Sequence, residues 1–281
     1  MKRNEIGVFS TCTGIGDIEK ALTAIRELGL GVVQLQSRHI PHVYYSREGA
    51  RKFAGILEDL GIDASSLCIV HEGERYDDQD AVERTVGYLP PDTLSKRLEY
   101  SRSCVDFAVA IGAPFVTTHM GVLPKTPSAP GYQRLLRSVR EVANYCKKAG
   151  IELALETGQE TGTELLEFII RVGEGVKVNF DGANLILYGQ DDPLMALHAL
   201  RDLIVHVHAK DGLPPTRPGL LGREVPLGEG KAEVREIVRV LVVSGYAGPF
   251  IMEIYSGIDR LLELRKGKSF LENYLATLST I

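Results

Sequence analysis

The sequence predicts a single (β/α)8 TIM barrel that spans residues 1–281. The main observation is a repeated pattern in which an amphipathic stretch ends in a glycine and a short apolar run follows. A glycine just past a helix end is the usual left-handed cap, so each repeat indicates a helix followed by a strand. The length of 281 residues suits one barrel of this kind. The five glycines are Gly29, Gly61, Gly112, Gly150 and Gly245.

Eight β-rich runs alternate with helical patterns along the chain, and this alternation favours a closed parallel barrel. A doubly wound open sheet is the alternative, but no GxGxxG motif opens the first unit, which weakens a dinucleotide-binding version. The strands are expected at Ile6–Ser10, Val32–Leu35, Leu67–Val70, Phe115–Thr118, Glu152–Leu155, Val176–Phe180, Ile204–Val207 and Phe250–Met252.

Two longer segments interrupt this rhythm, one near residues 72–92 after the third strand and one near 212–230 after the seventh. Both follow the carboxyl end of a strand, which is the end where barrel enzymes place their active sites. Long connections there are more often lids or binding loops than neutral insertions. We therefore expect both segments to be functional loops.

Composition excludes several classes of partner. The chain has 37 acidic and 32 basic residues, a formal net charge of −5, and no run of basic residues, so nucleic-acid binding is not expected. Its four cysteines are scattered and form no CxxC, which argues against a zinc ribbon or a disulfide framework and suits the cytoplasm. No apolar run approaches the ~18 residues of a membrane span.

Four acidic or imidazole side chains directly follow consecutive strands: Glu156, Asp181, His208 and Glu253. In a barrel these strand ends share one mouth, where three neighbouring carboxylates would repel one another. A bound cation removes this repulsion. Carboxylate oxygens with one imidazole suit Mn²⁺ or Mg²⁺, with Co²⁺ or Zn²⁺ as further candidates. The four residues are therefore predicted to bind one divalent metal ion.

The stretch VHVHAKDG contains a second histidine, His206, which would share a strand face with His208. The other three predicted ligands stand at the last strand position or just beyond it. His206 lies two residues deeper, about 6.6 Å along the strand. We therefore expect His208 to bind the metal and His206 to be a hydrogen-bonded polar member of the barrel interior.

Several of these motifs resemble the sugar phosphate isomerase/epimerase group of xylose-isomerase-like TIM barrels. The motifs are LALETGQET, VNFDGANLILYG, HVHAKDG, PLGEG and the terminal FIMEI. The resemblance implies a metal held by Glu156, Asp181, His208 and Glu253. It also implies that Glu156 and Glu253 act as an acid/base pair, which moves a proton next to a carbonyl through a metal-stabilised enediolate.

The chain departs from the pattern of the ketose 3-epimerases at two points. Asn184 stands where these relatives often carry a histidine, and the segment after Asp211 lacks an obvious counterpart of their arginine, with Arg217 and Arg223 as candidates. Besides C3 epimerisation, an aldose–ketose isomerase or a dehydratase of a keto-polyol therefore remains open. An endonuclease IV-like repair enzyme, which needs more histidines, and an inactive sugar-binding barrel are remote alternatives.

Further polar residues at the expected mouth are candidates for binding a small carbohydrate substrate, although each also has a structural interpretation such as core packing, helix capping or turn formation. Asp211 could instead orient His208 through a hydrogen bond. The glycine-rich segment Gly222–Lys231 could hold a phosphate, or could serve only a turn. Relatives are often oligomers, so a homodimer or homotetramer is expected. The substrate-binding candidates are His71, His119, Glu160, Asn184, Lys210, Asp211 and Arg223.

Overall fold

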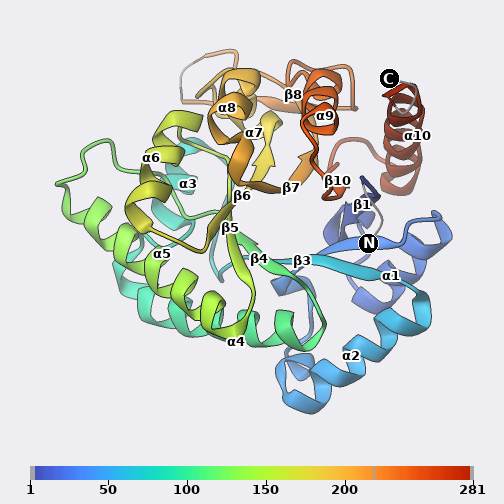
Figure 1. Cartoon of the computed structure of the whole chain (residues 1–281), viewed down its shortest axis with the longest axis horizontal. Coiled ribbons are helices and arrows are strands. Elements are labelled where there is room, and N and C mark those ends of the chain that lie inside the picture. Colours follow the sequence, from blue (N-terminus) through green and yellow to red (C-terminus); the bar gives the residue numbers. More distant parts are fainter. Residues whose placement is uncertain (1–3, 218, 279–281) are drawn as a thin grey trace.

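The strands of the protein close into a parallel barrel with helices on its outside (Figure 1). The structure is a computed structural model that describes residues 4–217 and 219–278. Around the barrel the strand order is β1-β10-β7-β6-β5-β4-β3-β2, and every neighbouring pair is parallel. The predicted fold class is therefore confirmed, and the doubly wound alternative is wrong because β1 also pairs with β10 and leaves no open edge.

All eight predicted strands are present, and most bounds agree within two residues. The exception is the third strand, which begins four residues before its predicted start because Ser65 and Ser66 belong to it. Both serines are fully buried, and these two polar residues interrupt the apolar run from which the strand was predicted. The barrel strands are β1 (Ile6–Phe9), β2 (Val32–Gln36), β3 (Asp63–Ile69), β4 (Phe115–Thr118), β5 (Glu152–Glu156), β6 (Val176–Asp181), β7 (Ile204–Ala209) and β10 (Phe250–Met252).

The helices lie around the barrel and bury their apolar faces against the strands. The five predicted cap glycines all have positive φ, between 61° at Gly61 and 91° at Gly245, as left-handed caps require. The helices are α1 (Ile18–Glu27), α2 (Arg47–Leu60), α3 (Gln79–Thr85), α4 (Leu94–Ala110), α5 (Pro130–Ala149), α6 (Gly162–Val172), α7 (Gly182–Leu187), α8 (Pro193–Leu200), α9 (Val234–Val243) and α10 (Arg260–Leu278).

The two long segments after β3 and β7 contain regular structure of their own. The first carries α3, and the second forms an antiparallel hairpin of β8 (Asp211–Leu213) and β9 (Arg223–Val225). The side chain of Gln79 donates to the carbonyls of Tyr188 and Leu220, so α3, the end of α7 and the hairpin loop are tied together. Both segments therefore help to cover the carboxyl ends of the strands. None of the described helices is both long enough and apolar enough to span a membrane.

Candidate active site and metal centre

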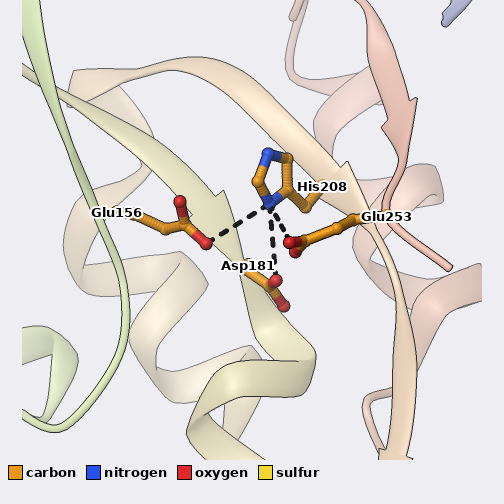
Figure 2. A group of neighbouring side chains, drawn as sticks. All are labelled: Glu156, Asp181, His208 and Glu253. Atoms are coloured by element: carbon orange, nitrogen blue, oxygen red, sulfur yellow. Dashed lines mark ion pairs between the residues drawn. The ribbon is translucent and has the colours of Figure 1, made fainter. Parts of the chain in front are cut away.

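The structure brings together the four side chains for which a metal site was predicted (Figure 2). Glu156 ends β5, Asp181 ends β6, His208 is the penultimate residue of β7, and Glu253 follows β10. From Nδ1 of His208, the nearest carboxylate oxygens of Glu253, Glu156 and Asp181 lie 3.0, 3.4 and 3.5 Å away. One ligand atom from each residue lies within 4.8 Å of all the others, and all four residues are buried.

Two buried atoms of this cluster lack a hydrogen-bond partner within the protein and are suited to bind a metal ion. Asp181 Oδ2 and His208 Nδ1 are buried without a hydrogen-bond partner, which is costly for polar groups unless a ligand satisfies them. Lys210 adds one positive charge beside Asp181 and Glu253. A divalent cation and this ammonium together neutralise the three carboxylates, so the residues present fit the proposed ion.

Asp181 uses its two oxygens for different purposes. Oδ1 accepts a hydrogen bond of 3.0 Å from the backbone N–H of Asn184 and so caps α7. This leaves Oδ2 directed at the cluster, where it has no hydrogen-bond partner. The start of α7 therefore fixes the orientation of the carboxylate, which is why an aspartate with a helix directly after it suits this strand end.

Gln34 of β2 reaches across the barrel and keeps a proton on Nε2 of the His208 ring. Gln34 Oε1, which can only accept, lies 2.5 Å from Nε2 of His208, so Nε2 carries a proton and Nδ1 is the ring nitrogen that faces the carboxylates. Gln34 is itself held by a 2.9 Å bond from its Nε2 to Thr117. Burial lowers the pKa of His208, but Glu156 and Glu253 outweigh this effect and raise it well above its ordinary value.

Replacing Gln34 with methionine is expected to weaken metal binding by about 10- to 100-fold, as the loss of such partners typically does. Methionine fills a similar volume but cannot accept the proton of His208 Nε2, so the ring loses its fixed orientation. Titration of the metal-free protein with Mn²⁺ measures the effect. Gln133→Met on the outside of α5 is the control, and equal affinities in the two variants would contradict this role for Gln34.

His206 has a different environment, as expected from its deeper position. Its Nδ1 lies 2.9 Å from Oδ1 of Asn179, and its Nε2 lies 3.0 and 3.3 Å from the hydroxyls of Ser65 and Ser66. Both ring nitrogens are thus used inside the barrel, one layer below the cluster. Burial lowers the pKa of His206 well below its ordinary value and keeps it neutral.

Three further predicted residues surround the two glutamates. His119 Nε2 lies 3.2 Å from Glu156 Oε1, and Asn184 donates to the same oxygen at 3.1 Å. Lys210 Nζ lies 3.0 Å from both Asn184 Oδ1 and Glu253 Oε2. Burial raises the pKa of each glutamate, but the neighbouring cations prevail: His119 and His208 hold the pKa of Glu156 well below its usual range, and Lys210 and His208 lower that of Glu253 to about 2. Both side chains are therefore carboxylates at neutral pH.

A cavity of about 370 Å³ opens directly above this cluster. Its walls combine the polar groups just described with apolar and aromatic side chains from β1, β3 and the two long segments. This volume suits a small molecule rather than a polymer, and the mixture of polar and apolar walls is typical of ligand sites. The lining residues are Phe9, Gln36, Cys68, Val70, Tyr76, His119, Glu156, Asn184, Leu187, Tyr188, Lys210, Leu221, Gly222, Glu224, Glu253 and Tyr255.

Comparison with protein families identifies this architecture. The model of the family described as "Xylose isomerase-like TIM barrel" matches residues 22–274, which is most of the chain. The protein belongs to this family. The resemblance inferred from the sequence motifs is therefore confirmed.

Three proteins are similar to this xylose isomerase-like barrel over most of its length. A "Xylose isomerase domain protein" from Planctomyces limnophilus is 30% identical, with a TM-score of 0.90 over 100% of this chain and 99% of that one. A xylose isomerase-like protein from Mycobacterium smegmatis, solved in complex with magnesium, is 20% identical over 99% and 98%, with a TM-score of 0.74. The L-ribulose-5-phosphate 3-epimerase UlaE of Salmonella heidelberg is 25% identical over 91% of this chain and 88% of its own length.

Three predicted substrate-binding residues lie outside the cavity of this xylose isomerase-like barrel. His71 contacts Glu74 and Ser101 with its two ring nitrogens and packs edge-on against Tyr88, so it serves packing. Glu160 is buried next to the N–H of Gly158, where burial raises its pKa to about 7, and Thr161 rather than Glu160 caps α6. Arg223 is exposed on β9, because in a strand it faces away from the cavity that its neighbour Glu224 lines.

Asp211 also proves to be a structural residue rather than a substrate ligand or a partner of His208. Its Oδ1 accepts hydrogen bonds from the N–H groups of Gly212 and Ala232, and its Oδ2 accepts from those of Gly228 and Gly230, all between 2.9 and 3.0 Å. The backbone of the glycine-rich segment can approach the Asp211 carboxylate this closely only because Gly230 has no side chain: a Cβ on Gly230 would lie 2.0 Å from Asp211 Oδ1. The carboxylate of Asp211 thus takes backbone N–H groups of the segment Gly222–Lys231, which were the candidates for binding a phosphate.

Asp211→Asn is expected to destabilise the protein by about 2 kcal/mol or more, because hydrogen bonds to a buried charge are worth ~1.5–3 kcal/mol each. The amide can keep one pair of backbone donors, but its NH₂ group then faces the other pair. Urea unfolding followed by circular dichroism measures the difference. Asp202→Asn, with a side chain that is 92% exposed, is the control and is expected to change little. A stability of Asp211→Asn equal to that of the control would contradict this role.

Several residues that shape the site were missed in the sequence. Gln34 and Asn179 lie inside the barrel within β2 and β6, and the available signal was an amide side chain between two apolar residues of a predicted strand. Tyr76 and Tyr188 reach the cavity from segments whose course the sequence does not define. Glu224 could have been found from the alternation of the β9 strand, had the hairpin been recognised.

Proposed function

We propose that this protein is a divalent-metal-dependent isomerase or epimerase that acts on a small sugar, sugar phosphate or keto-polyol. The observation that carries the proposal is the pair of glutamates, Glu156 and Glu253, which belong to one metal-ligand cluster and line one cavity. The names of the relatives support it: one is an L-ribulose-5-phosphate 3-epimerase, and fold neighbours include an L-ribulose 3-epimerase. Mn²⁺ or Mg²⁺ is the expected ion, with Co²⁺ or Zn²⁺ as replacements.

The two glutamates carry the proton transfers in this proposal. A divalent ion bound by Glu156, Asp181, His208 and Glu253 would supply Lewis-acid polarisation of the substrate carbonyl. One glutamate takes the proton from the carbon next to the carbonyl, and the other returns a proton. Because Glu156 and Glu253 are both ionised at neutral pH, either can act as the base. The glutamate that returns a proton to carbon must first take one up, from a substrate hydroxyl group or from water.

The neighbouring residues bind and orient rather than transfer protons to carbon. His119 and Asn184 hold Oε1 of Glu156, and Lys210 holds Oε2 of Glu253, so each glutamate has a fixed direction. Asn184 and Lys210 also line the cavity, where an amide and an ammonium can bind substrate hydroxyls. Asn184 cannot replace a proton-transferring imidazole, so the carbon that is epimerised or isomerised is decided by substrate position relative to the two glutamates.

The test is a screen of ketoses, their phosphates and inositol-like ketones with Mn²⁺ in D₂O, read by NMR. Deuterium incorporation next to the carbonyl together with a new isomer is the expected result. A product lighter by one water would instead select the dehydratase chemistry, for which the relatives named above provide no parallel. Cleavage of abasic DNA would select repair activity, and a purified protein with no metal affinity would favour the inactive sugar-binding barrel.

A further inference from the structure

We propose that the substrate is an uncharged sugar or keto-polyol and that the cavity rejects the corresponding phosphate ester. This inference rests on the proposed function and deepens it by choosing between the two substrate classes that it leaves open. It separates this chain from the relative named for L-ribulose 5-phosphate. The charges of the cavity and the backbone groups of its two rim loops carry the argument.

Glu224 is the lining carboxylate that the cations of the site leave unbalanced. A bound divalent ion and Lys210 would neutralise Glu156, Glu253 and the nearby Asp181, and His119 is paired with Glu156. Among the described lining residues there is no arginine. A phosphate dianion would therefore meet the carboxylate of Glu224 in a poorly solvated space, where like charges repel strongly. A neutral sugar would meet hydrogen-bond acceptors that suit its hydroxyl groups.

The loops that bind phosphate in many (β/α)8 barrels are those after the seventh and eighth strands, and both have their backbone donors occupied here. After β7, the N–H groups of Gly228, Gly230 and Ala232 donate to Asp211. After β10, the N–H groups of Tyr255 and Ser256 donate to Glu224 Oε1, each at 2.6 Å. Internal carboxylates thus take the donors that a phosphate would need.

Glu224 is the residue that we expect to determine this specificity. It reaches the cavity from β9 and is fixed by the two backbone donors of the β10 loop, so its charge cannot move away from a ligand. Burial raises its pKa, and Lys210 opposes that rise. The apolar walls beside it, which include Leu187, Leu221 and Tyr188, suit the carbon skeleton of a sugar.

Calorimetric titration with L-ribulose and with L-ribulose 5-phosphate, in the presence of Mg²⁺, tests the inference without relying on turnover. The free ketose is expected to bind at least about tenfold more tightly, the effect of roughly one unit charge at close range. Raising the salt concentration from about 20 to 200 mM should leave the ketose unaffected and strengthen binding of the ester, because salt screens repulsion. A phosphate held by attraction would show the opposite salt dependence.

Three variants make the comparison sharper. Glu224→Gln keeps an oxygen for the Tyr255 and Ser256 donors but removes the charge, so it should reduce the preference for the ketose by about tenfold. Glu229→Gln, an exposed change in the same segment, should leave the preference as it is. Arg260, which stacks on Tyr255 at 5.8 Å but does not line the cavity, supplies a third variant, Arg260→Gln.

The outcomes that overturn the inference are distinct from those that overturn the proposed function. Equal or tighter binding of the ester, weaker ester binding at high salt, or no binding of either compound would each overturn the inference. If Arg260→Gln abolished a preference for the ester, that guanidinium would be the phosphate ligand instead. Absence of deuterium exchange with both compounds would overturn the proposed function, while the ratio of the two affinities would still decide the inference.

Discussion

Glu156→Gln and Glu253→Gln are each expected to lower the rate of deuterium incorporation into the substrate by about 10²–10⁴-fold, the usual contribution of a general acid or base. Glutamine keeps the shape of the side chain but cannot take a proton from carbon. Because Asn184 and Lys210 hold the two carboxylates in place, the substitutions change their chemistry more than their position. NMR in D₂O with Mn²⁺ present measures the exchange.

The same strand offers a matched control for this prediction. Glu152 begins β5 at the opposite end of the barrel, and its side chain is 45% exposed, so Glu152→Gln should keep the wild-type rate. Both glutamates are also predicted metal ligands, and the metal content of each variant must therefore be measured. Wild-type exchange in both Glu156→Gln and Glu253→Gln would rule out their assignment as the acid/base pair.

Asp181→Asn is expected to abolish metal-dependent stabilisation and activity while leaving the fold intact. Asparagine keeps the oxygen that caps α7, but it replaces the free Oδ2 with an NH₂ group that cannot bind a cation. For the wild-type protein, a metal at about 100 times its Kd adds ~2.7 kcal/mol, which corresponds to a rise in Tm of roughly 5 °C. The variant should show no such rise.

Thermal unfolding with EDTA and with added Mn²⁺ or Mg²⁺ measures this difference. The activity of wild-type protein should disappear with EDTA and return when the metal is restored. Asp59→Asn, an exposed change on the outside of α2, should retain the full metal-dependent shift. A metal-dependent rise in Tm of Asp181→Asn as large as that of the wild type would place the ion elsewhere.

The sequence by itself determined the barrel and the four residues of the cluster. The helix-glycine-strand repeat is a local pattern, because cap glycines and β-rich runs act on their immediate neighbours. Eight β-rich runs that alternate with helical patterns then favour a closed barrel over an open sheet. Since the carboxyl ends of parallel strands share one mouth, Glu156, Asp181, His208 and Glu253 could be placed together from their positions at strand ends alone.

The tertiary structure decided which of the remaining polar residues face the cavity. His71, Glu160, Asp211 and Arg223 looked equivalent to His119, Asn184 and Lys210, because each stands near a strand end or in a long segment. Their roles depend on partners far away in the chain, such as Ser101 for His71 and the amide of Ala232 for Asp211. Burial and hydrogen bonding between distant segments leave no local pattern, and so the charge of the cavity appeared only with the fold.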